Sequence, residues 1–440
     1  MSLLILPGLL KQVCLSPHDT SSVNMNERYV SMGGVLMALG DFPEGNATAT
    51  RLKMISKTGQ STGLGIAVEI LQATLKKKVP ENASVCGEVE GIRFRYLSGS
   101  VVRPVSLPMA VLDTLRGLIG GVRLLAFPRS SDRLDFIIFY TPSFLKHSLP
   151  MLIAVMKGIP VFVEACEIRS KTTGGITRHA IVRMFDFTEK WMEWISPRVA
   201  SGIIPISHTI SDFYREKGIS EEKLFLLPIL IDCEVYRKTS ASFVKELEGK
   251  VYFLNSGSFV EKDGVGYIVA AFIEVLKKTP DIFLVFTGNV SDSDKDKVRA
   301  VFLENSLPEN VIFPGMLSRA ELVWAYQNAN ALLSCRTNSK YANFGFPTKI
   351  GEYLASGTIV IATRVGDTEI YLEDKKTALL AEPESVASIA SCMTYVIKNL
   401  MRSKAIGLSG RKIAQENFDY RVHADPLRRF IEGRLQLADQ

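Results

Sequence analysis

The chain has 440 residues, of which 47% are hydrophobic and 22% charged, the composition of a globular protein of about two to four domains. This composition excludes an intrinsically disordered chain, a fibrous repeat and a small disulfide-stapled protein, and no run of about 18 uncharged apolar residues predicts a membrane-spanning helix. The formal net charge is +6, and residues 1–200 hold 23 basic and 16 acidic side chains, so we expect an anionic partner or surface for this half.

Residues 1–31 differ from the rest of the chain, because their apolar start has neither the basic segment nor the cleavage site of a signal peptide. We expect a leader that is disordered or non-native. The six cysteines have no C-x-x-C spacing and no histidine at zinc-ligand distance, so we predict no zinc site. We expect small buried thiols in a reducing cytoplasm.

Short apolar runs alternate with helical patterns through the first half. Strands are predicted at residues 33–40, 65–71, 92–97, 134–140, 160–165, 202–207 and 224–229, and the helices between them include 46–58 and 107–125. The strand at 224–229 should end the sheet. Because buried strands of this kind alternate with helices, the sheet should be parallel and covered on both faces.

The second half repeats the alternation more regularly. Six strands are predicted, at residues 251–257, 281–287, 310–314, 331–336, 358–363 and 377–382. Asp263 is the expected cap of one helix, and Ser318 and Glu321 form a capping box for another. A third helix over 347–355 should end at Gly357.

The sequence thus predicts an α/β protein with two doubly wound, Rossmann-like domains. We place them at residues 32–234 and 235–418, followed by a C-terminal helix over 419–440 that returns to the N-terminal domain. Ligands of such sheets bind outside the carboxyl ends of the strands, so the cleft between the domains is the expected site. Hydride transfer, P-loop hydrolysis and serine hydrolysis are disfavoured, because their glycine-rich or nucleophile motifs do not occur.

The most informative stretch is NFGFPTKIGEYLASGTIVIATRVGD, residues 343–367. Pro347 is preformed for a first helical turn, and the free amides that follow it form an anion site. Lys349 adds a positive charge there, while Thr348 and Glu352 share a helix face. Glu352 could accept two hydrogen bonds from a ribose, so the spacing fits a bound nucleotide. A capped amphipathic helix with a surface Glu–Lys pair is the simpler alternative.

FPTKIGEYLASG, followed by TIVIAT and VGD, resembles the donor-binding signature of glycosyltransferase family 4, which has the GT-B fold. The resemblance covers most of the chain from about Gly33. It implies a retaining transferase that moves a sugar from a nucleotide-sugar donor to a hydroxyl acceptor, in glycan, exopolysaccharide or glycolipid assembly. It also implies that no cofactor, metal or nucleic acid takes part, and that the leaving phosphate takes the acceptor proton.

Residue by residue, the resemblance assigns the donor phosphates to two further segments. GDFPEGNATATR (40–51) is similar to the family's first loop, whose glycine maps to Gly45. SGSFVEKDGV (256–265) resembles the segment with a basic pair. The second basic position is Lys262, but the first is Ser258, where many members have Arg. Lys262, Lys349 and the helix amides at 347–350 should stabilise the leaving diphosphate in place of a metal.

The E-x7-E motif of the family is incomplete, because its second Glu is Glu352 but its first position is Phe344. The resemblance implies that Glu352 positions the ribose. Backbone amides near Gly345 and Phe346 are then expected to contact the donor sugar.

Arg51, Glu164 and Glu167 are the expected acceptor-side residues. Arg51 could instead cover a helix surface, and strand-end carboxylates are often structural. Two other functions remain open from the sequence. One is a catalytically silent GT-B module that binds a nucleotide or a partner, and the other is a nucleotide-sugar epimerase of similar fold.

A basic apolar helix over 107–127 indicates a membrane partner. Asp113, Arg116 and Gly120 form one narrow stripe and apolar residues cover the rest, with Arg103, Arg123 and Arg129 around it. Such a helix suits an anionic lipid surface and a lipid-linked acceptor, which predicts a cytoplasmic protein that is peripheral at the inner face of the membrane. A buried core helix is the alternative.

Overall fold

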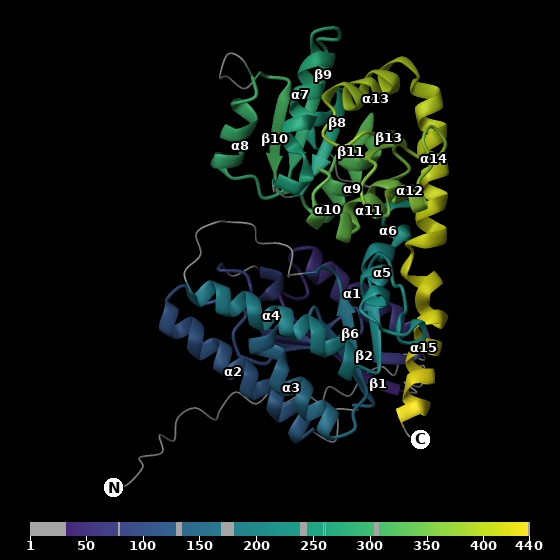
Figure 1. Cartoon of the computed structure of the whole chain (residues 1–440). Coiled ribbons are helices and arrows are strands. Elements are labelled where there is room, and N and C mark those ends of the chain that lie inside the picture. The colour runs from purple at the N-terminus through teal and green to yellow at the C-terminus, as the bar shows by residue number, and fades with distance from the viewer. Residues whose placement is uncertain are drawn as a thin grey trace, which may run out of the picture.

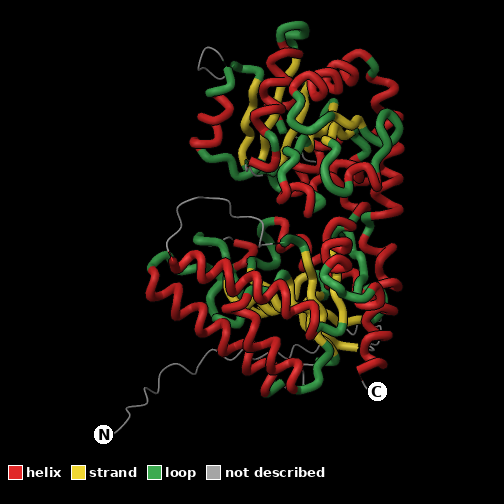
Figure 2. The backbone as a smooth tube through the Cα atoms, in the orientation of Figure 1, coloured by secondary structure: helices red, strands yellow, loops and turns green. Residues whose placement is uncertain are grey.

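A computed structural model of the chain describes residues 32–77, 80–128, 134–168, 180–237, 244–257, 259, 261–302 and 308–438. Two sheets, each wrapped by helices, lie one above the other in Figures 1 and 2, and the C-terminal helices run along one side of both.

The sheet of the first half has seven strands in the order β3-β4-β2-β1-β5-β6-β7. All neighbours are parallel except β3 and β4. The elements are β1 (Met32–Leu39), α1 (Ala47–Gln60), β2 (Leu64–Gln72), β3 (Cys86–Val89), β4 (Ile92–Tyr96), α2 (Leu107–Ala126), β5 (Phe136–Tyr140), α3 (Phe144–Met156), β6 (Val161–Ala165), α4 (Ala180–Val199), β7 (Gly202–Pro205), α5 (His208–Glu216) and α6 (Cys233–Arg237).

The second sheet has six parallel strands in the order β10-β9-β8-β11-β12-β13. The elements are β8 (Val251–Ser256), α7 (Val265–Leu276), β9 (Ile282–Thr287), α8 (Asp292–Arg299), β10 (Val311–Gly315), α9 (Arg319–Asn328), β11 (Ala331–Ser334), α10 (Lys340–Phe344), α11 (Thr348–Ser356), β12 (Val360–Thr363), α12 (Thr368–Tyr371), β13 (Leu379–Ala381), α13 (Val386–Lys398), α14 (Leu400–Asn417) and α15 (Ala424–Ala438).

The two doubly wound sheets and the six strands of the second half are as predicted, but three local features differ. The antiparallel strand β3 was not expected. Residues 224–229 do not form a strand, although an isolated bridge from Leu224 to Ile203 and backbone hydrogen bonds from Phe225 and Leu227 join them to β7. Asp263 does not cap α7, whose N-cap is Gly264 in the left-handed conformation (φ 63°). The Ser318–Glu321 capping box and the end at Gly357 are confirmed.

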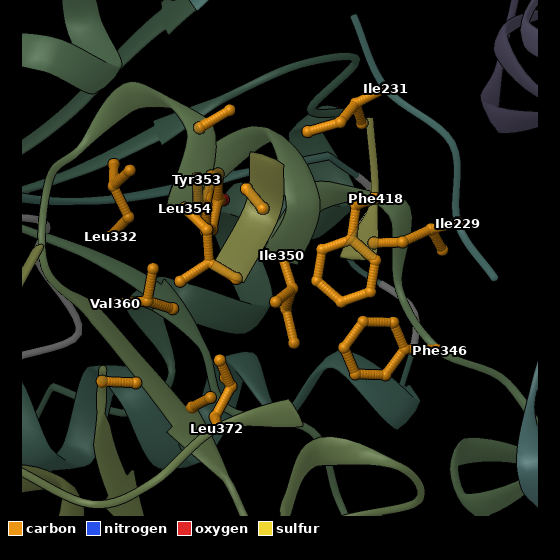
Figure 3. Close-up of a cluster of buried hydrophobic side chains, with 14 of the residues drawn as sticks. Ile229, Ile231, Leu332, Phe346, Ile350, Tyr353, Leu354, Val360, Leu372 and Phe418 are labelled. Atoms are coloured by element: carbon orange, nitrogen blue, oxygen red, sulfur yellow. The ribbon is translucent and has the colours of Figure 1, made fainter. Parts of the chain in front are cut away.

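The inner face of α11 is packed into a hydrophobic cluster that reaches from the second sheet to the connection between the sheets (Figure 3). Ile350 and Leu354 are buried there beside Ile229 and Ile231. A Cβ atom on Gly351 would lie 2.8 Å from Cδ1 of Ile229, so a larger residue would require that side chain to move. The helix is therefore fixed against the connecting segment.

The chain crosses between the sheets twice, and the two crossings are hydrogen-bonded to each other. The amide of Ile231 donates to the carbonyl of Phe418 (2.9 Å), and the amide of Tyr420 donates to the carbonyl of Ile231 (3.0 Å). After the second crossing α15 packs on the first sheet, where the ring of Phe430 lies 5.1 Å from Phe225 and 5.8 Å from Phe162. The last helix thereby joins the N-terminal sheet.

Helix α2 packs on the first sheet through small and polar residues along most of its length, and through Leu124 and Leu125 at its C-terminal end. Gly117 and Gly121 are buried, and Asp113 is buried because its carboxylate accepts a hydrogen bond from Gln72 (2.9 Å). Several apolar side chains nearer its N-terminus are exposed, and Leu107 is 77% exposed. The alternative of a buried core helix therefore holds only for the C-terminal end of α2, and the predicted polar stripe is split between the sheet and solvent.

No helix in the described part of the chain is long and apolar enough to span a bilayer. Cys166, Cys233, Cys335 and Cys392 are free thiols. Cys86 is disulfide-bonded, so the prediction of reduced cysteines is wrong for this residue.

The packing of α2 gives a stability prediction. A Cβ atom on Gly117 would lie 1.9 Å from the carbonyl oxygen of Leu71, so Gly117→Ala must move the helix. We expect a loss of about 1–3 kcal/mol in the free energy of unfolding, measured by urea denaturation. Gly266→Ala in α7 is the control, because its Cβ would meet no atom within 4 Å. Equal stability of the two variants would contradict this packing.

Candidate active site

The second sheet changes direction between β8 and β11, because strands on either side of this pair follow in opposite orders. Ligands of open α/β sheets bind at the carboxyl ends of strands at such a point. Three segments meet there: the loop after β8, the end of β11 and the first turn of α11. These segments form the candidate site.

The loop after β8 is held against the end of β11 by backbone contacts. The amide of Thr337 donates to the carbonyl of Lys262 at 3.0 Å. A Cβ atom on Gly264 would lie 2.0 Å from the carbonyl oxygen of Cys335, so only glycine can occupy that position. The position of Lys262 is therefore set by the strand beside it.

Lys262 and Lys349, the two predicted catalytic lysines, are brought into one cluster. Lys349 Nζ lies 3.3 Å from the carbonyl oxygen of Ser256 and 3.6 Å from Oδ1 of Asp263. Lys262 Nζ lies 4.0 Å from the ring centroid of Tyr341. Burial lowers the pKa of both lysines, and the positive charge of Arg336 lowers it further, while Asp263 acts in the opposite direction.

Glu352 lies one turn along α11 from this cluster and is partly exposed, on the same face as Thr348. Its Oε1 lies 3.2 Å from Nη1 of Arg319 at the start of α9. The guanidinium of Arg319 in turn lies 4.9 Å from the ring centroid of Tyr236. Arg319 and Arg336 were both missed by sequence reasoning, because a single arginine at a helix start or strand end carries no signal of its partners.

The segment before α11 is anchored by its side chains and exposes backbone. Phe346 is buried against Tyr371 and Phe418, so its ring belongs to the core. The carbonyl of Gly345 accepts a hydrogen bond from Arg336. Pro347 is the N-cap residue of α11, and its carbonyl accepts from Ile350. Contact of the Gly345 and Phe346 backbone with a donor sugar stays a prediction.

The remaining donor-side residues lie elsewhere. Gly45 is exposed at the carboxyl edge of the first sheet, next to Asn46, the N-cap of α1. Ser258 lies outside the described residues.

Arg51 and Glu164, predicted on the acceptor side, are 4% and 0% exposed and form an ion pair at 2.8 Å. Arg51 also donates to the carbonyls of Leu227 (2.7 Å) and Pro228. The pair thereby joins α1, β6 and the segment after β7. We infer a structural role for both residues in place of the predicted contact with an acceptor.

Glu167, the third acceptor-side residue, lies where the two halves of the chain meet. Its Oε2 accepts a hydrogen bond from the hydroxyl of Tyr341 at 2.9 Å, and its charge raises the pKa of Lys262. It also lines a small cavity with Thr141 and Tyr214 at the carboxyl ends of β5 and β6. Glu167 is thus placed between this cavity and the lysine cluster.

Asp367, from the VGD segment, ties the second sheet to the first. Its carboxylate accepts hydrogen bonds from the amides of His208 (2.7 Å) and Thr209 (3.4 Å) at the start of α5. The hydroxyl of Ser207 donates to the carbonyl of Phe344 at 2.7 Å. A carboxylate at a helix N-terminus is favourable because the free amides and the helix dipole are positive there.

Among the residues that the structure describes, no group of three or more His, Cys, Asp or Glu side chains is placed to hold a metal ion.

Residues 237–413, which include the whole second sheet, match the family described as "Glycosyl transferases group 1". Residues 237–413 therefore form a glycosyl transferase group 1 domain, and the fold is that of the retaining GT-B transferases. The chain is a glycosyltransferase that uses a nucleotide-sugar donor, as the resemblance predicted.

Curated relatives of this glycosyltransferase act in glycan and glycolipid synthesis. It is 22% identical over 334 residues to the alpha-1,3/1,6-mannosyltransferase ALG2 of Dictyostelium discoideum, over 68% of this chain and 77% of that protein. It is 23% identical to the GDP-mannose-dependent alpha-(1-6)-phosphatidylinositol monomannoside mannosyltransferase of Mycolicibacterium smegmatis, over 40% of this chain and 46% of that protein. It is 25% identical to the alpha-monoglucosyldiacylglycerol synthase of Streptococcus pneumoniae, over 53% of this chain and 54% of that protein.

Solved structures show the same fold. Sucrose-phosphate synthase from Thermosynechococcus elongatus superimposes with a TM-score of 0.68 at 15% identity, over 91% of this chain and 98% of that chain. HepE of Anabaena, solved with UDP and glucose, gives a TM-score of 0.66 at 14% identity, over 91% and 100% of the two chains.

The buried ion pair of the glycosyltransferase gives a second stability prediction. Arg51→Met leaves Glu164 buried without its cation, so we expect a loss of about 3–5 kcal/mol in the free energy of unfolding. Arg51→Met with Glu164→Leu removes both charges and should recover part of that loss. The measurement is a double-mutant cycle by urea denaturation. Additive losses would show that the two side chains are not coupled.

Proposed function

We propose that this glycosyltransferase transfers a hexosyl group from a nucleotide-diphosphate sugar to a lipid-linked acceptor, in glycan, exopolysaccharide or glycolipid assembly. The observation that carries the proposal is the cluster of Lys262 and Lys349 at the switch point of the second sheet. Two partly buried ammonium groups beside the N-terminus of α11 form a site for a diphosphate. Uracil and guanine nucleotides are both candidates, because a structural neighbour was solved with UDP and a relative is named as GDP-mannose-dependent.

In this proposal the donor lies across the start of α11. The diphosphate contacts the two lysines and the amides after Pro347, and the ribose hydroxyls bind Glu352, with Arg319 holding that carboxylate in position. The backbone of Gly345 and Phe346 faces the donor sugar, and Gly45 approaches the phosphates from the first sheet. Ser258 follows β8 in sequence, and its proposed role near the phosphates rests on the family resemblance alone.

Catalysis then depends on electrostatic stabilisation of the leaving group. The bond between the anomeric carbon and the diphosphate oxygen breaks, and the acceptor hydroxyl oxygen bonds to the same carbon on the same face. The hydroxyl proton passes to the departing diphosphate, which is now the base. Because negative charge grows on the diphosphate as the bond breaks, fixed cations around it lower the barrier without a metal.

The acceptor is proposed to enter at Glu167, which lies beside the lysine cluster and lines the cavity of the first sheet. A lipid-linked acceptor is supported by relatives whose names include phosphatidylinositol monomannoside and diacylglycerol. We propose residues 32–234 and 235–418 as acceptor-side and donor-side domains. The return of α15 to the first sheet supports assigning residues 419–440 to the acceptor side.

An exposed apolar surface on the acceptor-side domain is the proposed membrane contact. Helices α2, α3 and α4 lie side by side over one face of this domain (Figure 1). Their exposed apolar residues define the docking face: Leu107, Met109, Val111, Leu112, Leu115, Ile119, Leu145, Leu149, Leu152, Met156, Trp191 and Trp194. A patch of this kind marks an interaction site in a folded protein.

Basic side chains surround the docking face and favour an anionic lipid surface over a neutral apolar partner. Arg103, Arg116, Arg123, Lys157 and Lys190 are all exposed on or next to the three helices. Each such charge contributes about 1 kcal/mol near an anionic leaflet. We propose that the protein acts at the inner, cytoplasmic face of a membrane, with this face against the lipid.

The donor site is tested by comparing binding with turnover. Glu352→Gln removes a charged hydrogen-bond acceptor for the ribose, so affinity for the nucleoside diphosphate should fall about 10- to 150-fold. Lys262→Ala should reduce turnover more than donor binding, because its charge acts mainly on the leaving diphosphate. Product formation and diphosphate binding are measured for wild type and both variants, with UDP and GDP sugars and with EDTA present.

Loss of wild-type activity in EDTA would contradict the metal-free site. Binding and turnover like wild type in both variants would overturn the assignment of Glu352 and Lys262. Donor consumption without a glycosylated acceptor would favour the epimerase, and nucleotide binding without turnover would favour the silent module.

The docking face is tested by flotation with liposomes of neutral or anionic lipid. We expect salt-sensitive binding to anionic liposomes only, because the basic residues act through screened charge. Arg116→Glu with Arg123→Glu should abolish it, and Leu112→Ser with Leu115→Ser should weaken it. The matched control is Lys404→Glu with Lys412→Glu, which changes two exposed lysines on α14. Equal binding by all variants would overturn this docking face.

A further inference from the structure

Arg336 is a third cation of the lysine cluster, and nothing in the sequence motifs assigned it. It follows β11 at the carboxyl edge of the second sheet, and its carbonyl accepts a hydrogen bond from Thr363 Oγ1 at 2.8 Å. The side chain is only 6% exposed. Its charge lowers the pKa of both Lys262 and Lys349, so the three groups act on one another.

The guanidinium of Arg336 is only partly satisfied by the described residues. Nη1 donates to the carbonyl of Gly345, but the buried Nε has no hydrogen-bond acceptor. No acidic side chain in the described ranges lies within ion-pair distance of it; the charge of Asp263 raises its pKa, but the contact of that carboxylate at 3.6 Å is with Lys349. A buried guanidinium without a carboxylate or an acceptor for each donor is costly to fold.

We propose that Arg336 binds the donor diphosphate, with its free Nε edge donating to a phosphate oxygen while Nη1 holds the segment at Gly345. This assignment rests on the proposed donor site and adds to it a residue that resemblance did not supply. A planar guanidinium suits the role, because it forms two directed hydrogen bonds with phosphate and stays charged. The anchored Nη1 fixes the orientation of the free edge before the ligand arrives.

The consequence is a link between the diphosphate and the segment that faces the donor sugar. One side chain contacts both the phosphate and the carbonyl of Gly345, so movement of the Gly345–Pro347 segment would break the phosphate contact. The lysines act as point charges with lowered pKa, whereas the planar guanidinium of Arg336 forms hydrogen bonds of fixed direction. Binding of the diphosphate by Arg336 should therefore be lost even when a positive charge is kept but the planar group is removed.

The test measures binding of inorganic pyrophosphate, UDP, GDP, uridine and guanosine to the full chain by calorimetry. Pyrophosphate reports on the cation cluster without depending on the base. Arg336→Gln should weaken binding of pyrophosphate and of the preferred nucleoside diphosphate about 10- to 100-fold, and leave binding of the nucleoside unchanged. Arg336→Lys should recover only part of this loss. The control is Arg364→Gln, because Arg364 follows the neighbouring strand β12 but pairs with Glu369 and Glu382.

Equal affinity of wild type and Arg336→Gln for pyrophosphate would overturn the assignment. So would an equal loss for nucleoside and diphosphate, which is the result of a purely structural role. If Arg336→Gln does not fold, Arg336→Lys decides, since wild-type affinity in that variant contradicts a directed contact. Absence of pyrophosphate and nucleoside diphosphate binding in wild type would overturn the proposed donor site itself, and this assignment with it.

Discussion

The packing of α11 against the segment that connects the two sheets is the constraint on which the active site depends. Ile350, Gly351 and Leu354 face Ile229 and Ile231, and the glycine allows the helix to approach within van der Waals contact of the connection. Because side chains three and four residues apart share a helix face, fixing this inner face leaves Lys349 and Glu352 partly exposed beside the ends of β8 and β11. The geometry of the proposed donor site is therefore tied to the connection between the halves of the molecule.

The electrostatics of this site oppose the stability of the unliganded protein. Burial lowers the pKa of Lys262, Lys349 and Arg336, so each cation is held at a cost that Asp263 offsets only in part. Such a cost is expected where a ligand supplies the missing charge, because an anion that binds only the folded state returns the free energy. A preorganised positive site also needs no rearrangement as charge grows on a leaving group, which is the property that a transferase without side-chain nucleophile requires.

The sequence predicted the features that depend on neighbouring residues, and it missed those that depend on residues far apart in the chain. The strands of the second sheet, the Ser318–Glu321 capping box and the end of α11 at Gly357 are set by neighbouring residues and were predicted. Residues 224–229 are apolar like a strand, but they are buried as a connection with one bridge to the sheet. Asp263 looked like a helix cap, yet Gly264 takes that position and leaves the carboxylate beside Lys349. The pairs Arg51–Glu164 and Arg319–Glu352 join residues far apart in the chain, and no spacing rule reveals them.

The orientation of α2 shows how a polar stripe can be buried and an apolar one exposed. Gly117 approaches the backbone of Leu71 so closely that no larger residue fits, and Asp113 finds its partner in Gln72, so the small and polar side of the helix is the one that matches the sheet. The leucines on the other side keep a large part of their apolar surface in water, although burying each fully would contribute about 1.5–3 kcal/mol. This free energy of burial can be gained only when a second surface covers these leucines. The first half of the chain also carries the basic excess, and exposed arginines lie among these leucines, a combination that matches the acyl and headgroup layers of an anionic membrane better than the surface of another protein.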